Sequence, residues 1–267
     1  MDLATLKRFE QHLQAAYPDF RVDFKDQSWS QKVIGFLMTF NPGYMTDFIT
    51  TIGSTVYFPT RAFYEVDPAS SLATLAHESV HIYDSKRTLW FKLSYLFPQI
   101  LAVIPVLLFV AFTGLNSWVL AILLVGYVTA CASYKISKLV FGMVLGASLM
   151  AFLSLGCYYT GWHMLILLGL AMLAPWPAPW RVKWELRGYG MTMAMLQWMW
   201  RSAVDNRSAT VTNFVNSSYF FMSWSRASVE KNLEATRQQA EMGALQRIEP
   251  YATVYAFLES NRLLYGQ

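Results

Sequence analysis

The middle of the chain almost lacks charge. Between Leu93 and Pro179 there is no aspartate or glutamate, and the only lysines or arginines are Lys135 and Lys138. Charged residues make up 14% of the whole sequence, whereas soluble domains usually contain about a quarter. This deficit argues against an ordinary solvated surface for the block and favours a segment that lies in a membrane.

Other absences narrow the class of protein further. The chain has only two cysteines, Cys131 and Cys157, and both lie in apolar sequence, so no disulfide framework is expected. The basic residues do not form the stripe that nucleic-acid binding requires, so no nucleic-acid partner is expected. The first eight residues contain no apolar run, and a cleaved signal peptide is therefore not expected.

The apolar block divides into four segments, 93–113, 117–134, 139–158 and 162–180. A membrane-spanning helix needs about 20 apolar residues, which predicts four transmembrane helices. The alternative is two buried helical hairpins of a globular protein outside the membrane.

Basic residues flank this block in a one-sided pattern. With four crossings, every basic junction lies on the same side, which the positive-inside rule assigns to the cytoplasm. The sequence thus predicts an integral protein of the inner or plasma membrane, in contact with membrane lipids, with both termini and the active site cytoplasmic. The basic residues at these junctions are Lys86, Arg87 and Lys92, then Lys135 and Lys138, then Arg181, Lys183 and Arg187.

Outside the block, the hydrophobic periodicity predicts mixed secondary structure. Strands are expected at 21–24, 48–52 and 54–58, where β-branched and aromatic residues cluster, and Gly53 separates the last two. Residues 205–225 are expected to be irregular. Helices are expected at 2–16, 28–40, 184–201, 226–242 and 249–264, with a further one after the Asp67–Ser71 cap region.

The most specific motif is His77-Glu78-Ser79-Val80-His81. On a helix, two histidines four residues apart lie on one face, so both rings can bind one zinc ion. Glu78 would then act as the general base on a water molecule. In a chain with so few histidines, this pattern would occur by chance about 0.002 times. The alternative is a solvated helix with two unrelated histidines.

Catalytic zinc usually has three protein ligands. Glu185 is the predicted third ligand, because it follows the apolar block and is the only acidic residue between Asp84 and Asp205. Asp84 is the rival ligand; its other interpretations are, first, an acceptor behind the ligands and, second, a partner of Lys86 or Arg87 on the helix surface. Tyr189, one turn after Glu185, is a candidate for oxyanion stabilisation, although simple packing would also explain a tyrosine there.

These residues resemble the gluzincin type of zinc peptidase, and in architecture the CAAX prenyl proteases and heat-shock-induced membrane proteases. The resemblance implies zinc bound by His77, His81 and Glu185, with Glu78 as the base. It also implies a strand beside the active-site helix that holds an extended peptide by backbone pairing. The candidates for that strand are Thr55, Val56 and Tyr57, which a purely internal strand would explain equally well.

The predicted fold is therefore an α+β zincin-like domain combined with a transmembrane four-helix insertion, mostly α overall. Residues 1–92 and 181–267 would form the cytoplasmic domain, and residues 93–180 the insertion. The predicted function is that of a zinc-dependent membrane metalloprotease that hydrolyses peptide bonds of a peptide or protein substrate at the cytoplasmic face. The alternative is a non-catalytic membrane scaffold or regulator with a metal-stabilised fold.

Overall fold

The structure is a computed structural model of the 267-residue chain. It describes residues 1–39, 41–95, 97, 101, 104–105, 107–108, 111, 117–134, 137–161, 178–200, 207–215, 222–223 and 225–264.

The chain forms two compact units. The first unit contains Met1–Phe24, Ile49–Pro98 and Pro175–Gln267, and the second contains Lys25–Phe48 and Gln99–Ala174. The first unit thus joins the two ends of the chain, and both halves of the predicted metal site belong to it.

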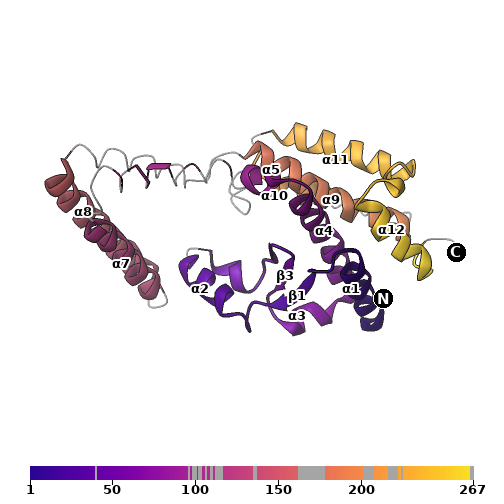
Figure 1. The fold of residues 1–267 in the computed structure, drawn as a ribbon, viewed down its shortest axis with the longest axis horizontal. Helices are drawn as coiled ribbons and strands as arrows, with labels where there is room; N and C mark the ends of the chain where they lie inside the picture. Colours follow the sequence, from indigo (N-terminus) through magenta and orange to yellow (C-terminus); the bar gives the residue numbers. More distant parts are fainter. Residues whose placement is uncertain are drawn as a thin grey trace. The chain divides into compact units, whose positions relative to one another are not determined.

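Helices dominate the first unit, and two of them, α4 and α9, pack against each other along their lengths (Figure 1). Its elements are α1 (Leu3–Ala16), β1 (Arg21–Phe24), β2 (Thr50–Ile52), β3 (Thr55–Phe58), α3 (Arg61–Val66), α4 (Pro68–Arg87), α5 (Leu89–Tyr95), α9 (Pro179–Trp200), α10 (Arg207–Val215), α11 (Arg226–Glu241), η5 (Leu245–Arg247) and α12 (Tyr251–Ser260).

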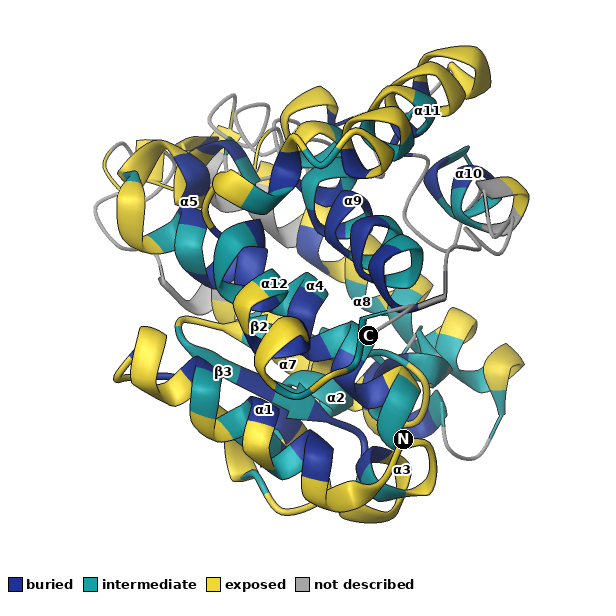
Figure 2. Cartoon of the chain, turned by 90° about the vertical axis from the view of Figure 1, so that its right-hand side faces the viewer, coloured by how far each residue is buried: buried dark blue, intermediate teal, exposed yellow. Residues whose placement is uncertain are grey.

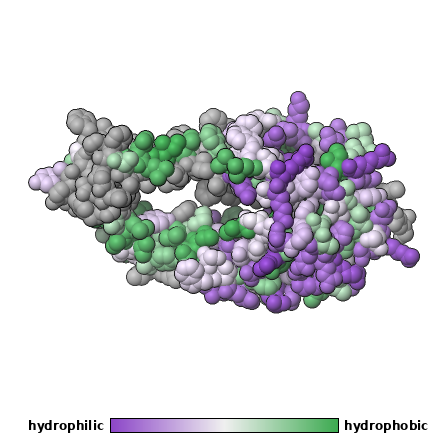
Figure 3. Space-filling model, viewed as in Figure 1, coloured by the Kyte–Doolittle hydropathy of each residue, from purple (hydrophilic) through white to green (hydrophobic). Residues whose placement is uncertain are grey.

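The core of this unit forms from apolar residues that recur at helical spacing. On α1, Leu6, Phe9 and Leu13 are fully buried, as their spacing of three and four residues predicts. They join the buried faces of β3, α4, α9 and α12 in one cluster. Figure 2 shows these buried positions in dark blue, for example along α9. Much of the unit's visible surface is hydrophilic (Figure 3).

Helix α4 begins where its sequence predicts. The Asp67 side chain accepts hydrogen bonds from the backbone N–H groups of Ala69 and Ser70, both at 3.1 Å, and Pro68 occupies the first helical position. Lys86 and Arg87 lie in the last turn, where positive charge is favourable. These signals fix a 20-residue helix with residues 77–81 near its middle.

The sheet has three strands in the order β1-β3-β2. Strand β1 pairs with β3 in parallel, with Arg21 opposite Thr55, and β2 pairs with β3 antiparallel, with Thr51 opposite Val56. Gly53 has a φ of 65°, which allows the tight turn between β2 and β3. The central strand is therefore β3, and β1 and β2 are the edges.

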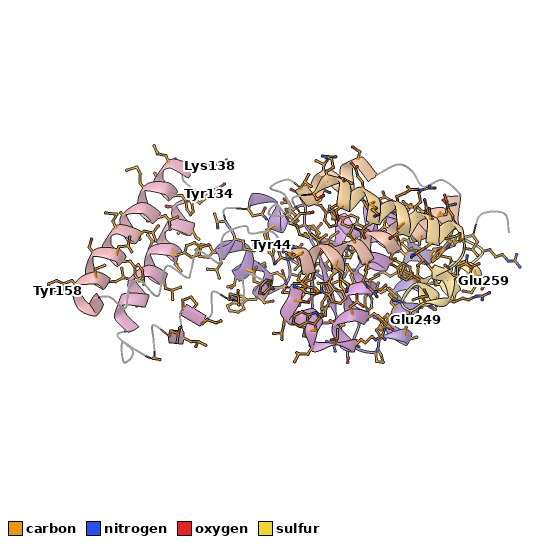
Figure 4. The ribbon with its side chains drawn as sticks, turned by 90° about the horizontal axis from the view of Figure 1, so that it is seen from above. Tyr44, Tyr134, Lys138, Tyr158, Glu249 and Glu259 are labelled. Carbon is orange, nitrogen blue, oxygen red and sulfur yellow. The ribbon has the colours of Figure 1, made fainter. Side chains whose placement is uncertain are left out.

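The second unit contains α2 (Trp29–Leu37), η1 (Pro42–Met45), α7 (Ser117–Tyr134) and α8 (Lys138–Thr160). Helices α7 and α8 pack closely, and a Cβ added at Gly126 would lie only 2.3 Å from the Cβ of Ser148. Lys138 and Tyr158 lie near opposite ends of α8 (Figure 4). Within this unit, the buried Lys25 ammonium donates to the carbonyl of Tyr44 at 2.7 Å, and burial lowers its pKa to about 8.

Within the part of the chain that the structure describes, no helix combines the length and the hydropathy needed to cross a membrane. The predictions of four transmembrane helices and of an integral inner or plasma membrane protein with cytoplasmic termini and active site are therefore wrong. Of the segments predicted at 93–113 and 162–180, large parts lie outside the described residues. Helices α7 and α8 pack against each other and bury Ala130, Cys131 and Phe152, whereas other large apolar residues on both helices, such as Val125 and Leu139, are exposed.

The predicted fold class is corrected in the same way. The described residues form 11 α-helices and one small three-stranded sheet, so the protein is mostly helical rather than an α+β zincin-like domain with a transmembrane insertion. The region 205–225, expected to be irregular, contains α10. Its Val211 and Phe214 are buried in a second apolar cluster with Val229 and Leu233 of α11. Tertiary packing therefore overrides the weak local helical signal there.

Candidate metal centre

Helix α4 places the two histidines of the motif on one face. His77 and His81 are one turn apart, and their rings meet edge to face with centroids 5.0 Å apart. The Nε2 atoms are 3.2 Å apart. Only 14% of the His77 side chain and 8% of the His81 side chain is exposed. Because both Nε2 atoms point to the same place, they can act as ligands to one ion.

Helix α9 supplies the third group. The Oε2 atom of Glu185 lies 3.5 Å from Nε2 of His77 and 3.7 Å from Nε2 of His81. The Glu185 side chain is nearly buried. Glu185, His77 and His81 form a cluster that could hold a metal ion. Since sequence separates Glu185 from the motif by more than 100 residues, the packing of α9 on α4 creates this site.

The spacing of the three atoms agrees with tetrahedral zinc. Zinc binds imidazole nitrogen and carboxylate oxygen at about 2.0–2.2 Å, so two ligand atoms in a tetrahedron are separated by about 3.4 Å. The three observed separations are 3.2, 3.5 and 3.7 Å. A set of two imidazoles and one carboxylate with an open fourth position is also typical of catalytic zinc. The residues therefore fit the ion.

A glycine allows α9 to approach α4 this closely. A Cβ at Gly188 would lie 2.5 Å from Nε2 of His77 and 2.7 Å from its Cε1. Real Cβ atoms do not approach other atoms so closely, so any larger residue would displace the ring or the helix. Gly188 is one turn after Glu185, and the two residues together form the face of α9 that contacts the histidines.

Tyr95 holds the second oxygen of Glu185. Its hydroxyl donates a short hydrogen bond to Oε1, while Oε2 faces the histidines. Tyr95 is held in turn by Arg181, whose Nε donates to the Tyr95 carbonyl at 3.0 Å. The Nε1 of Trp184 donates to the Ser94 hydroxyl at 2.9 Å. Helix α5 is thus fastened to α9 beside the ligand, and it fixes the orientation of the carboxylate.

Asp84 does not join the cluster. Both of its carboxylate oxygens accept from Arg187 of α9, at 2.9 Å from Nε and 3.0 Å from Nη2. The predicted partners have other contacts, since Lys86 pairs with Asp19 at 3.1 Å and Arg87 donates to the Tyr83 hydroxyl at 3.4 Å. Asp84 is therefore a buried link between the two ligand helices.

The charges of the cluster are strongly coupled. Burial, the largest single influence, lowers the pKa of His81, but the charge and hydrogen bond of Glu185, together with the charges of Glu78 and Asp84, offset burial and raise the pKa to about 9. Burial would raise the pKa of Glu185, but the charge of His81 and hydrogen bonds from both rings hold it well below its usual value. Without a metal ion, a proton on His81 thus compensates the buried Glu185 carboxylate. A divalent cation can take over this role.

Glu78 lies outside the three-atom cluster, as a general base must. Its Oε2 accepts a hydrogen bond of 2.6 Å from the Thr51 hydroxyl of β2. Tyr189, the candidate oxyanion stabiliser, packs its ring against His77 at right angles, with centroids 4.9 Å apart. The same ring also contacts Phe214.

The predicted substrate strand is in the wrong place. Thr55, Val56 and Tyr57 belong to β3, which is hydrogen-bonded on both sides and has no free edge for an added strand. The strand that touches the motif is β2, through Thr51 and Glu78. Among the strands of the described chain, β2 is therefore the edge at which an extended peptide could pair.

Sequence reasoning missed four residues that shape the site. Thr51, Tyr95 and Arg187 each act through a partner that is distant in sequence, so no local pattern indicates them. Gly188 did leave a signal, because a glycine inside a predicted helix commonly marks a close approach of another group.

Aromatic packing also holds the imidazole rings of His77 and His81 in place. His81 contacts Phe91 and Tyr95, with ring centroids 6.0 and 5.9 Å apart, and its buried Nδ1 has no hydrogen-bond partner among the described residues.

Comparison with known protein families, with curated proteins and with solved structures finds no match to this chain. The function must therefore be argued from the site itself.

Proposed function

We propose that this chain is a zinc-dependent hydrolase that cleaves peptide bonds. The observation that supports this most directly is the meeting of His77, His81 and Glu185 at tetrahedral spacing, with Glu78 adjacent to the ligands but outside their cluster. A purely structural zinc site would instead have four protein ligands and no neighbouring base.

Each residue has a defined task in the proposed reaction. Zinc bound to His77, His81 and Glu185 would supply Lewis-acid activation of the substrate carbonyl. Glu78 accepts the proton of the attacking water and delivers it to the leaving amine. The hydrogen bond from the Thr51 hydroxyl fixes the orientation of the Glu78 carboxylate.

Strand β2 favours a peptide as the substrate. Strand β2 is at the edge of the sheet, and its Thr51 contacts Glu78. Backbone pairing at a strand edge binds extended chains without requiring one particular sequence. A bound peptide would therefore pass beside the base and the ligands. The resemblance of His77, Glu78, His81 and Glu185 to the gluzincin motif is consistent with this proposal. Membership of that class remains a prediction.

The decisive test is Glu78→Gln. Glutamine preserves the shape of the side chain but cannot accept the proton, so activity on denatured protein substrates should fall by about 10²–10⁴-fold. Zinc content should remain at one per chain, because Glu78 is not a ligand. The matched control is Glu259→Gln, an exposed glutamate near the end of α12 (Figure 4), which should alter neither quantity.

The two candidate functions give different results in this experiment. A hydrolase loses turnover in Glu78→Gln and keeps zinc. A non-catalytic protein with a metal-stabilised fold shows no hydrolysis in any variant, although it too keeps zinc. Zinc-loaded wild-type protein that cleaves no peptide bond in a diverse peptide mixture would overturn the proposal.

A further inference from the structure

A groove of about 810 Å³ lies on the first unit, between α9, α11 and the segment around η5. It contains none of the three metal-binding residues, although Arg187, which lines it, also pairs with Asp84 beside the metal centre. The α9 residues that line it recur every three or four positions and form one face of the helix, from Pro179 to Arg187. Glu185 and Gly188 point to α4 instead. Its volume falls within the range of about 300–1,000 Å³ that is common for ligand sites.

The wall formed by α11 is polar but uncharged. Ser228, Asn232, Thr236 and Gln239 line the groove at successive turns. The side of α11 beyond its buried residues, away from the groove, is charged instead. Two ion pairs form there, Arg226–Glu230 and Arg237–Glu241. An ordinary solvated helix would have charged residues on both sides. The neutral side is thus suited to hydrogen bonding with a ligand.

Two of these side chains present acceptors. The Asn232 amide nitrogen donates to the Ser228 carbonyl at 2.7 Å, so the side-chain oxygen of Asn232 remains as an acceptor. The Thr236 hydroxyl donates to the Asn232 carbonyl at 3.0 Å, so its oxygen can also accept. A row of acceptors along a helix matches the N–H groups of an extended peptide.

The opposite wall is apolar and basic. Val182 and Leu186 of α9, together with Leu245 and Ile248, line the groove and can cover apolar side chains of a ligand. Lys183 and Arg187 add positive charge, and none of the described residues that line the groove is acidic. Asp84 engages two of the five N–H donors of Arg187. Because Asp84 offsets the charge of Arg187, the positive charge at this wall comes mainly from Lys183, and it favours an acidic ligand.

We infer that the groove between α9 and α11 binds an extended peptide segment in which acidic residues alternate with apolar ones. From Ser228 to Gln239, α11 rises about 16 Å, which corresponds to about five residues of extended chain. The acidic side chains lie at Lys183 and Arg187, and the apolar ones contact Val182, Leu186 and Leu245. The backbone N–H groups face Asn232 and Thr236.

The test uses the full chain with the Glu78→Gln substitution, so that hydrolysis cannot consume the probe. The probe is a fluorescein-labelled pentapeptide of alternating leucine and glutamate, and binding is measured by fluorescence anisotropy at low salt. A second probe has lysine in place of glutamate. The acidic probe should bind at least tenfold more tightly than the basic one, and added salt should weaken its binding.

Two variants locate the binding. Lys183→Glu should weaken binding of the acidic probe at least tenfold, because it reverses the charge of one wall. Asn232→Leu should weaken it severalfold through loss of the acceptor. Lys231→Glu is the matched control, because Lys231 is exposed on α11 and does not line the groove. It should have little effect.

Three outcomes would overturn the inference. They are equal affinity for the two probes, unchanged binding in Lys183→Glu, and binding of decanoate to the groove without binding of the acidic peptide. Zinc content of each variant reports whether the first unit is folded. The groove is separate from Glu78, so a failure of peptide binding here would leave the proposed hydrolase function unaffected, and absence of hydrolysis would leave this binding test valid.

Discussion

Helices α4 and α9 build the metal centre in different ways. Helix α4 contributes two ligands and the proposed base within five consecutive residues, and the helical repeat alone brings them together. Helix α9 contributes one ligand, Glu185, together with Gly188, whose missing side chain makes room for the His77 ring. The first contribution is local, whereas the second depends on packing between distant parts of the chain.

The difference shows where such a site is vulnerable. The α4 half requires only that the helix forms, and its cap and length ensure that. The α9 half requires the correct depth, rotation and register against α4. The Asp84–Arg187 pair and the Tyr95–Glu185 hydrogen bond supply this alignment. Substitutions on α9 and its supports should therefore affect the site even where no ligand is removed.

The largest expected effect is the loss of a ligand from either helix. Glu185→Ala and His81→Ala should each reduce zinc affinity by more than the ~10–100-fold that is typical for loss of a residue behind the ligands. Each leaves only two protein ligands, and zinc sites usually need at least three. Zinc content after dialysis against a weak chelator measures this. Stoichiometric zinc in Glu185→Ala would mean that α9 is not part of the site.

Gly188→Ala should have the next largest effect, although it removes no polar group. The new Cβ would lie 2.5 Å from Nε2 of His77, so the ring or α9 must move. We expect about 1–3 kcal/mol of destabilisation from this overpacking and weaker zinc binding.

Gly142→Ala is the matched control for Gly188→Ala. Gly142 also lies in a long helix, α8, but nothing lies within 4 Å of a Cβ built there. Alanine should stabilise that position by about 0.4–1 kcal/mol. Thermal unfolding with and without zinc distinguishes the two. If Gly188→Ala behaved like Gly142→Ala, the close packing of α9 on His77 would be wrong.

The same contrast explains how much of the structure the sequence could predict. The start of α4 and the three strands follow from local signals, and the structure contains them at Pro68–Arg87, Arg21–Phe24, Thr50–Ile52 and Thr55–Phe58. Glu185 was noticed because acidic residues are absent around it, not because any pattern relates it to the histidines. Its actual meeting with them depends on packing.

Predictions that needed tertiary information were the ones that failed. Asp84 was considered as an alternative ligand, as an acceptor behind the ligands or as a partner of nearby Lys86 or Arg87, but its carboxylate pairs with Arg187, 103 residues away. Val56 and its neighbours were proposed as a substrate edge, but only the pairing of β3 with both β1 and β2 shows that this strand is central. The apolar block was assigned to a membrane, because an apolar run alone does not distinguish spanning helices from packed ones.

The smallest expected effect comes from Tyr95→Phe, which tests the support of α9 without altering a ligand or the space around it. The Tyr95 hydroxyl donates to Oε1 of the nearly buried Glu185, and phenylalanine removes only that donor. Loss of such a partner typically weakens metal binding by ~10–100-fold, and we expect the lower end because Oε2 still faces both histidines. Competition with a zinc chelator gives the affinity. Tyr134→Phe on α7 is the control and should leave zinc affinity unchanged (Figure 4). Equal affinities in the two variants would show that helix packing alone, without Tyr95, fixes the Glu185 carboxylate against α4.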